Sequence, residues 1–213
     1  MNRHRRTLSI ALGIAALGAP LTARAQQLRP GSDYTVLKPE LPVETQGKIE
    51  VLEFFWYGCP HCYGLEPLLE TWIQKLPADV QFKRVPAVFS ERWAKDAAIF
   101  YALEASGNLE RLHRPLFDAI HRDALKTDNG QAVGQWLSKN GVDTKKFDEV
   151  GRSFSVQSKV RRAAQLSTAY RIEGTPALAV HGRYTIGTER GHAGMLATAD
   201  YLIEQVRRNA PPK

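Results

Sequence analysis

The stretch that decides the fold is VLEFFWYGCPHCYGLEP, residues 51–67 of the 213-residue chain. It contains the only two cysteines, Cys59 and Cys62. Residues 49–56 are almost continuously apolar and rich in β-branched and aromatic side chains, which predicts a strand buried on both faces. Gly58 ends this run, so we expect the cysteines at the point where a central strand leaves its sheet.

A helix is predicted directly after the first cysteine. Pro60 suits the first helical turn, where its missing N–H is no loss, and apolar residues recur at helical spacing as far as about residue 75. Pro67 lies inside this pattern and should kink the helix. Residues 80–85 read as a second strand, and a strand–helix–strand unit favours parallel pairing of its strands.

Two cysteines this close together could have a structural role, so those alternatives come first. A disulfide across so short a loop removes only about 2 kcal/mol of chain entropy, which makes it a poor staple. A structural zinc site needs four ligands, but there is no second cysteine pair, and His113 and His121 are eight residues apart. A c-type haem needs histidine directly after the second cysteine, where this chain has Tyr63. Redox chemistry is the favoured interpretation.

A redox role explains the placement of both cysteines. Cys59 precedes a helix, where unpaired N–H groups and the positive end of the dipole stabilise thiolate over thiol. A protonated or hydrogen-bonding His61 would add to this preference. Because the reduced form is then stabilised, the disulfide becomes an oxidant. Cys62, one turn further along, should be less exposed and should resolve the mixed disulfide that Cys59 forms with a substrate.

Glu53 is an acidic residue inside the otherwise apolar strand. Strand alternation places it on the face of Val51 and Phe55, so we expect a buried carboxylate near the base of the cysteine turn. Such a group could relay a proton to or from Cys62, or it could pair with a basic residue such as Lys83 for structural reasons. The sequence leaves both alternatives open.

The rest of the chain divides into an arm, a helical block and a second group of strands. Residues 26–47 are rich in proline and glycine and predict an extended arm with one short strand. Residues 90–170 hold four or five segments with helical periodicity, enough for a small subdomain. Strands return at 177–181 and 183–186 as a hairpin, and a last helix is predicted over 193–207.

Residues 1–25 have the pattern of a cleaved signal peptide: a basic start, a short apolar run and small residues at 23–25. The apolar run of about ten residues is well short of the about 20 that span a bilayer. Its removal would take away four arginines and lower the formal net charge from +7 to +3, which gives no reason to expect nucleic-acid binding. We expect an exported protein whose mature chain begins near Gln26.

Taken together, these motifs resemble the DsbA-type periplasmic thiol:disulfide oxidoreductases. The resemblance rests on VLEFFWYGCPHC, the helical block and EGTPALAVHGRY at residues 173–184. It implies an α/β fold, a thioredoxin-like mixed sheet flanked by helices with an inserted all-helical subdomain. Residues 26–89 and 171–213 would form the thioredoxin-like domain, and residues 90–170 the insertion. A low cysteine pKa and a strongly oxidising disulfide are known properties of that family.

The resemblance also implies the residues of the site. Those of the redox centre are Cys59, Pro60, His61, Cys62 and Glu53. Cys59 resembles the nucleophile, Cys62 its buried partner and His61 the residue that stabilises the thiolate. Thr175 and Pro176 resemble the cis-proline element that faces the disulfide and pairs with an extended substrate segment.

The expected function is donation of the Cys59–Cys62 disulfide to reduced exported proteins in the periplasm, by a monomer without metal, flavin or nucleotide. A membrane quinone-linked partner of the DsbB type would reoxidise it. One alternative is a disulfide reductase or isomerase, although the related isomerases dimerise through an extra N-terminal domain, and the residues before Gly47 are too few for one. Another is a chaperone-like binder that uses the surface around Pro176.

Overall fold

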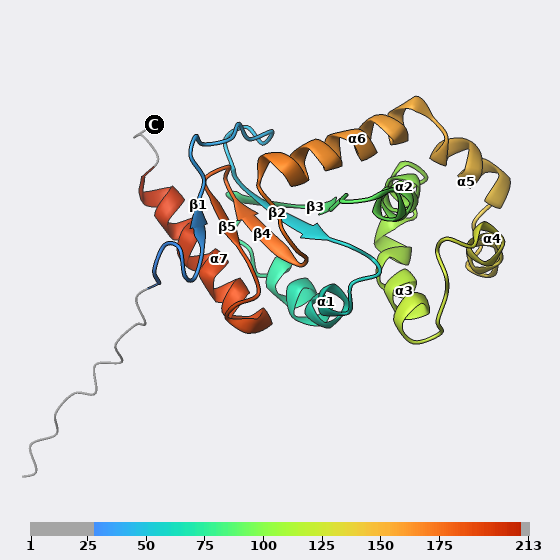
Figure 1. Cartoon of the computed structure of the whole chain (residues 1–213), viewed down its shortest axis with the longest axis horizontal. Coiled ribbons are helices and arrows are strands. Elements are labelled where there is room, and N and C mark those ends of the chain that lie inside the picture. Colours follow the sequence, from blue (N-terminus) through green and yellow to red (C-terminus); the bar gives the residue numbers. More distant parts are fainter. Residues whose placement is uncertain (1–27, 210–213) are drawn as a thin grey trace, which may run out of the picture.

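A five-stranded mixed sheet forms the centre of the protein, whose computed structural model describes residues 28–209 (Figure 1). Its strands lie in the order β1-β5-β4-β2-β3. They are β1 (Thr35–Val36), β2 (Ile49–Phe55), β3 (Val80–Pro86), β4 (Ala177–Val180) and β5 (Tyr184–Ile186). The mixed sheet and the short strand in the N-terminal arm are as predicted.

Strand β2 is the centre of the sheet, and all seven of its residues are buried. It pairs in parallel with β3, where Glu53 lies opposite Arg84, and antiparallel with β4, where Glu53 lies opposite Leu178. The predicted strand–helix–strand unit with parallel pairing is therefore confirmed. A strand with neighbours on both edges and helices on both faces needs the near-continuous apolar run that the sequence shows.

Helices α1 (Pro60–Ile73) and α7 (Gly191–Arg208) cover one face of the sheet (Figure 1). Their buried side chains, including Leu65, Leu69 and Met195, pack with Val51 and Leu178 of the sheet. Helix α1 begins at Pro60 as predicted and continues through Pro67 as one helix. The last helix starts two residues before the predicted position.

A block of helices joins β3 to β4 and covers the other face and one end of the sheet (Figure 1). It comprises α2 (Glu91–Ala105), α3 (Leu109–His121), α4 (Gly130–Lys139), α5 (Thr144–Gly151) and α6 (Phe154–Ala169). Four of these helices begin at a polar residue whose side chain accepts a backbone N–H of the first turn: Ser90, Asn129, Asp143 and Ser153. The predicted helical insertion between strands of the sheet is confirmed.

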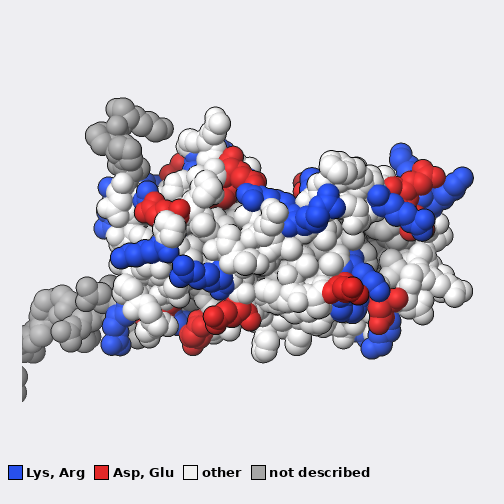
Figure 2. Space-filling view, turned by 45° about the horizontal axis from the view of Figure 1, so that its top comes forward, with Lys and Arg blue, Asp and Glu red and all other residues white. Residues whose placement is uncertain are grey.

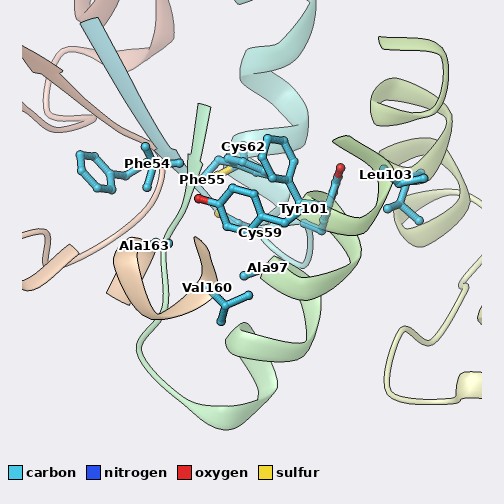
Figure 3. Close-up of a cluster of buried hydrophobic side chains, with 14 of the residues drawn as sticks. Phe54, Phe55, Cys59, Cys62, Ala97, Tyr101, Leu103, Val160 and Ala163 are labelled. Atoms are coloured by element: carbon cyan, nitrogen blue, oxygen red, sulfur yellow. The ribbon is translucent and has the colours of Figure 1, made fainter. Parts of the chain in front are cut away.

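The larger hydrophobic core lies between the sheet and this helical block. Both cysteines belong to it, together with Phe54 and Phe55 of β2 and Tyr101 of α2 (Figure 3). The segment that carries the cysteines is thus part of the larger hydrophobic core. No helix within residues 28–209 has the length and apolar character to cross a membrane. The predicted signal peptide lies outside the described residues.

Candidate active site

The cysteine turn follows directly from the end of β2. The amide of Cys59 donates to the carbonyl of Trp56 at 3.0 Å, which closes a tight turn. Cys59 is the N-cap of α1, with extended backbone angles (φ −87°, ψ 117°), and Pro60 is the first helical residue. The carbonyl of Cys59 accepts from the amide of Tyr63 at 3.1 Å. The sulfur of Cys59 is therefore held at the end of α1 where backbone N–H groups lack helical partners.

The environment of Cys59 favours its thiolate. A hydrogen bond from the Cys62 thiol is the largest cause, and the Thr175 side chain and the backbone N–H groups of Cys62 and His61 add to it against the opposing effect of burial. Together they lower the pKa of Cys59 to about 5. His61 thus contributes its backbone N–H, while its side chain is exposed.

Cys62 has the opposite character. It is completely buried, whereas Cys59 is 7% exposed. Burial, with the hydrogen bond and the charge of Cys59, raises the pKa of Cys62 well above that of a free thiol. Both cysteines are free thiols in this structure, so it represents the reduced protein. One sulfur is set up as a nucleophile and the other as a proton-holding partner.

Thr175 and Pro176 lie against the cysteine turn although they are more than a hundred residues away in sequence. Their peptide bond is cis, and the carbonyl oxygen of Thr175 accepts from the Cys59 thiol at 3.2 Å. The contact follows from the sheet, because β4 begins at Ala177 and pairs with the end of β2 that leads into the turn. Both residues also line a groove of about 420 Å³, whose other lining residues fall within 31–35, 171–177 and 185–189.

Glu53 is fully buried, as expected, but its basic partner is not Lys83. Nε of Arg84 lies 3.2 Å from Glu53, whereas Lys83 pairs with Glu50 at 2.9 Å. The prediction of Lys83 was wrong because the parallel register sets Arg84, and not Lys83, opposite Glu53. Successive residues of a strand point to opposite faces, so the neighbouring cation faces the other way.

A second buried acid, Glu66 of α1, shares Arg84 with Glu53. Nη2 of Arg84 donates to Glu66 at 3.2 Å. Burial and the nearby charge of Glu66 raise the pKa of Glu53 to about 8, against the opposing effect of Arg84. The charge of Glu53 is also among the causes that raise the pKa of Cys62. Glu53 is therefore both a paired residue and a proton-holding group close to Cys62.

The sequence did not single out Glu66, Arg84 or Asp96 as part of the site. Asp96 accepts hydrogen bonds from Trp56 Nε1 at 2.6 Å and from Thr127 Oγ1 at 2.5 Å. Trp56 also stacks on Trp93, with ring centroids 4.3 Å apart. This arrangement fixes a partly exposed aromatic surface beside the cysteine turn. In the sequence, Glu66, Arg84 and Asp96 are marked only by a charge within an apolar pattern. Many surface helices show the same pattern.

Two histidines of α3, His113 and His121, both lie within hydrogen-bond distance of Tyr57. Nδ1 of His113 lies 2.9 Å from the Tyr57 hydroxyl oxygen, and Nε2 of His121 lies 2.8 Å from its carbonyl oxygen. Tyr57 itself is buried in the core, while Trp56 is half-buried. The helical block is thereby connected to the segment that carries Cys59.

Comparison with known proteins identifies the family. The protein family described as "DSBA-like thioredoxin domain" matches residues 78–195 of this chain. The thiol:disulfide interchange protein DsbA of Azotobacter vinelandii is 41% identical over 92% of this chain and 96% of its own. The chain belongs to the DsbA family.

Other DsbA proteins agree with this assignment in sequence and in structure. DsbA of Bordetella pertussis is 43% identical over 95% of this chain and 98% of its own. The crystal structure of Pseudomonas aeruginosa DsbA is 39% identical, with a TM-score of 0.80 over 84% of this chain and 94% of that chain. The DsbA of Xylella fastidiosa gives the same TM-score, 0.80, at 30% identity, over 85% of this chain and 98% of that chain. The predicted DsbA-type fold and thiol:disulfide oxidoreductase activity are thus confirmed.

Proposed function

We propose that this DsbA-family protein donates its Cys59–Cys62 disulfide to reduced exported proteins as they fold. The observation that carries the proposal is the position of Cys59 as N-cap of α1, within reach of the Cys62 thiol and of the backbone N–H groups of His61 and Cys62. These groups favour the Cys59 thiolate, and a stabilised reduced form makes the disulfide an oxidant. A reductase would need the reverse preference.

In the proposed reaction, a substrate thiolate attacks Sγ of Cys59 in the oxidised protein. The Cys59–Cys62 bond breaks, a mixed disulfide forms, and Cys62 leaves with the electron pair as a thiolate. A second substrate thiolate then attacks the substrate sulfur of the mixed disulfide and releases Cys59 as its stabilised thiolate. The substrate is oxidised by two electrons, and the enzyme ends as the dithiol.

Glu53 is proposed to supply the proton that Cys62 needs when it leaves. Burial raises the pKa of Glu53 to about 8, so the carboxyl group holds a proton at neutral pH. The proton moves to the Cys62 thiolate, whose own pKa is raised by burial, and Glu53 regains a proton from solvent before the next turnover. The pairing with Arg84 supports this role, since it limits the cost of the transient carboxylate.

Thr175 and Pro176 are proposed to hold the substrate chain in the groove next to Cys59. The groove lies between the loop before β4 and the loops flanking β1 and β5. An extended peptide laid there can form main-chain hydrogen bonds, which gives broad rather than sequence-specific recognition. Pro60 and His61, which follow Cys59 in the chain, are both exposed and are proposed to meet the approaching substrate.

We further propose a periplasmic location and reoxidation by a membrane quinone-linked protein of the DsbB type, with the protein acting as a monomer. On the face shown in Figure 2, basic and acidic side chains are interspersed rather than gathered into one basic patch. On this face the distribution suits an enzyme with many protein substrates and shows no single basic patch of the kind that binds nucleic acid.

Equilibration of the mature protein with glutathione buffers tests the oxidant proposal. We expect the dithiol form to dominate until the buffer is strongly oxidising, so that the measured potential lies well above that of thioredoxin. A potential as low as that of thioredoxin would overturn the proposal. Cys59→Ser should abolish all oxidation of a reduced test protein. If this variant keeps the full effect on folding yields, the chaperone-like alternative is favoured instead.

A further inference from the structure

Two buried acids and one cation lie beneath the cysteine turn. Glu53 and Glu66 are both completely buried, and Arg84 reaches both, at 3.2 Å in each case. One cation between two carboxyl groups leaves an excess negative charge if both are ionised. In a buried site this excess is costly, so the pair is expected to keep one proton at neutral pH.

The geometry shows which acid keeps the proton. Neither oxygen of Glu53 accepts a hydrogen bond from the described residues, because Nε of Arg84 is near but poorly aligned. Glu66 has one hydrogen bond, from Nη2 of Arg84 to its Oε2, while its Oε1 accepts none and lies 3.5 Å from Nε2 of His113. A buried carboxylate without hydrogen bonds is more costly than one with them, so Glu53 is the neutral member.

His113 is fixed toward Glu66 by Tyr57. It is 5% exposed and lies among the rings of Phe55, Phe100 and Phe117, so a neutral imidazole is favoured there, and burial accordingly lowers the pKa of His113. A carboxylate can only accept, so Nε2 carries the proton that faces Glu66. Nδ1 then accepts from the Tyr57 hydroxyl at 2.9 Å.

We propose that Glu66, His113 and Tyr57 are positioning residues that act through Arg84 to keep the proton on Glu53, ready for Cys62. The Tyr57 hydroxyl fixes the tautomer of His113, and the N–H of His113 stabilises the negative charge of Glu66. Ionised Glu66 then pairs with Arg84, so that Arg84 favours the ionisation of Glu53 less. The inference rests on the proposed proton transfer from Glu53 and extends it to helix α3.

The charges around the two acids are consistent with this chain of effects. Glu53 faces Arg84 from β3 and Glu66 and Cys62 from α1, while its partner on β4 is the apolar Leu178. Glu66 faces His113 and Arg114 from α3 in addition to Arg84, and these outweigh the opposing effect of its burial, so that the pKa of Glu66 is lowered. If Glu66 were neutral, Arg84 would act on Glu53 alone and favour its ionised form.

Infrared spectroscopy of the reduced protein over a pH series tests the proposal without measuring turnover. The wild type should show the C=O band of a buried carboxylic acid that disappears with a midpoint near 8, and Glu53→Gln should remove it. Glu66→Gln should move the loss of the Glu53 band to lower pH by at least about one unit, a tenfold change in proton affinity. In His113→Phe the Glu66 carboxylate loses its support and competes with Glu53 for the shared proton, so the loss of the Glu53 band should also move to lower pH.

Two further variants guard against effects of misfolding. Tyr57→Phe removes only a hydroxyl group and should shift the Glu53 band in the same direction as His113→Phe, by a smaller amount. Glu50→Gln changes a buried acid of the same strand that pairs with Lys83, and it should leave the band unchanged.

The outcomes separate the two proposals. A band that survives Glu53→Gln alone would overturn the proton transfer from Glu53. A band that Glu53→Gln removes, but whose midpoint stays the same in Glu66→Gln, His113→Phe and Tyr57→Phe, would overturn the positioning role and leave the transfer intact.

Discussion

Nε2 of His121 donates a hydrogen bond to the carbonyl oxygen of Tyr57 at 2.8 Å, two residues before the reactive Cys59. A carbonyl oxygen only accepts, so the ring nitrogen must carry the proton. His121 belongs to α3 and Tyr57 to the segment that leaves the sheet. The helical block therefore holds the backbone of the cysteine turn directly, in addition to covering it.

His121→Ala should loosen this turn. Loss of a partly buried hydrogen bond costs about 1 kcal/mol, and it leaves the Tyr57 carbonyl unpaired. We expect faster hydrogen exchange at the amides of residues 57–59 and a several-fold lower rate of substrate oxidation, with the fold retained. His121→Gln, whose amide can donate, should recover part of the rate. Equal rates for both variants and the wild type would show that the bond does not position the turn.

The two cysteines predict a specific pH dependence. The folded-state pKa of Cys59 lies near 5, below that of an unfolded thiol, so its thiolate stabilises the folded reduced protein at higher pH. This contribution is lost as the pH falls through about 5. The pKa of Cys62 is raised, so Cys62 stays protonated in both states over the acidic range and adds nothing to the change. The free energy of unfolding of the reduced protein, minus that of the oxidised protein, should therefore decrease from pH 7 to pH 5 and stay nearly constant below pH 5.

Replacement of Cys62 separates its hydrogen bond from its redox role. Cys62→Ala removes the largest cause of the low pKa of Cys59, so the pH midpoint of Cys59 alkylation should rise. Cys62→Ser keeps a donor and should stay closer to the wild type. Neither variant can form the internal disulfide, so when the Cys59 thiolate attacks a disulfide of an oxidised protein and expels one of its thiolates, the mixed disulfide should accumulate. An unchanged midpoint in Cys62→Ala would assign the low pKa to the helix terminus alone.

Gly58 is required next to the stacked indoles. A Cβ atom at this position would overlap the ring of Trp56, which is itself held by Trp93 and Asp96. Gly58→Ala should therefore displace Trp56, change the tryptophan fluorescence and slow substrate oxidation. Gly134→Ala in α4 has open space around the added atom and serves as a matched control. Unchanged fluorescence in Gly58→Ala would mean that the turn itself moves instead.

Phe117 joins the helical block to the core beneath the cysteines. Its ring is fully buried, 4.9 Å from that of Tyr57 and 6.0 Å from that of Phe55. Phe117→Ala should lower the free energy of unfolding by about 3–5 kcal/mol. Leu68 of α1 is 46% exposed, and Leu68→Ala should cost at most about 1 kcal/mol. Chemical denaturation of both variants checks the difference.

Much of the fold follows from local patterns in the sequence. The apolar run of β2, the proline at the start of α1 and the spaced apolar residues of the helices each specify one element. The cap residues Ser90, Asn129, Asp143 and Ser153 mark helix starts that the chain composition alone would leave vague. These signals are short-range, so one sequence is enough to detect them.

The charged part of the site depends on relationships that the sequence does not contain. Lys83 and Arg84 are adjacent, and only the register of β3 against β2 decides which of them reaches Glu53. His113 follows Leu112 on the apolar face of α3, where a histidine usually has a packing role. Its contact with Glu66 requires the docking of α3 against α1, a tertiary fact without a local signature.

The antiparallel pairing of β2 with β4 brings Thr175 to Cys59 across 116 residues of chain. During synthesis the cysteines therefore emerge first, well before the strand that completes their surroundings. Until β4 is in place, Cys59 lacks the Thr175 contact and the groove beside it. The complete surroundings of Cys59 therefore form only when nearly the whole length of the chain is available to fold.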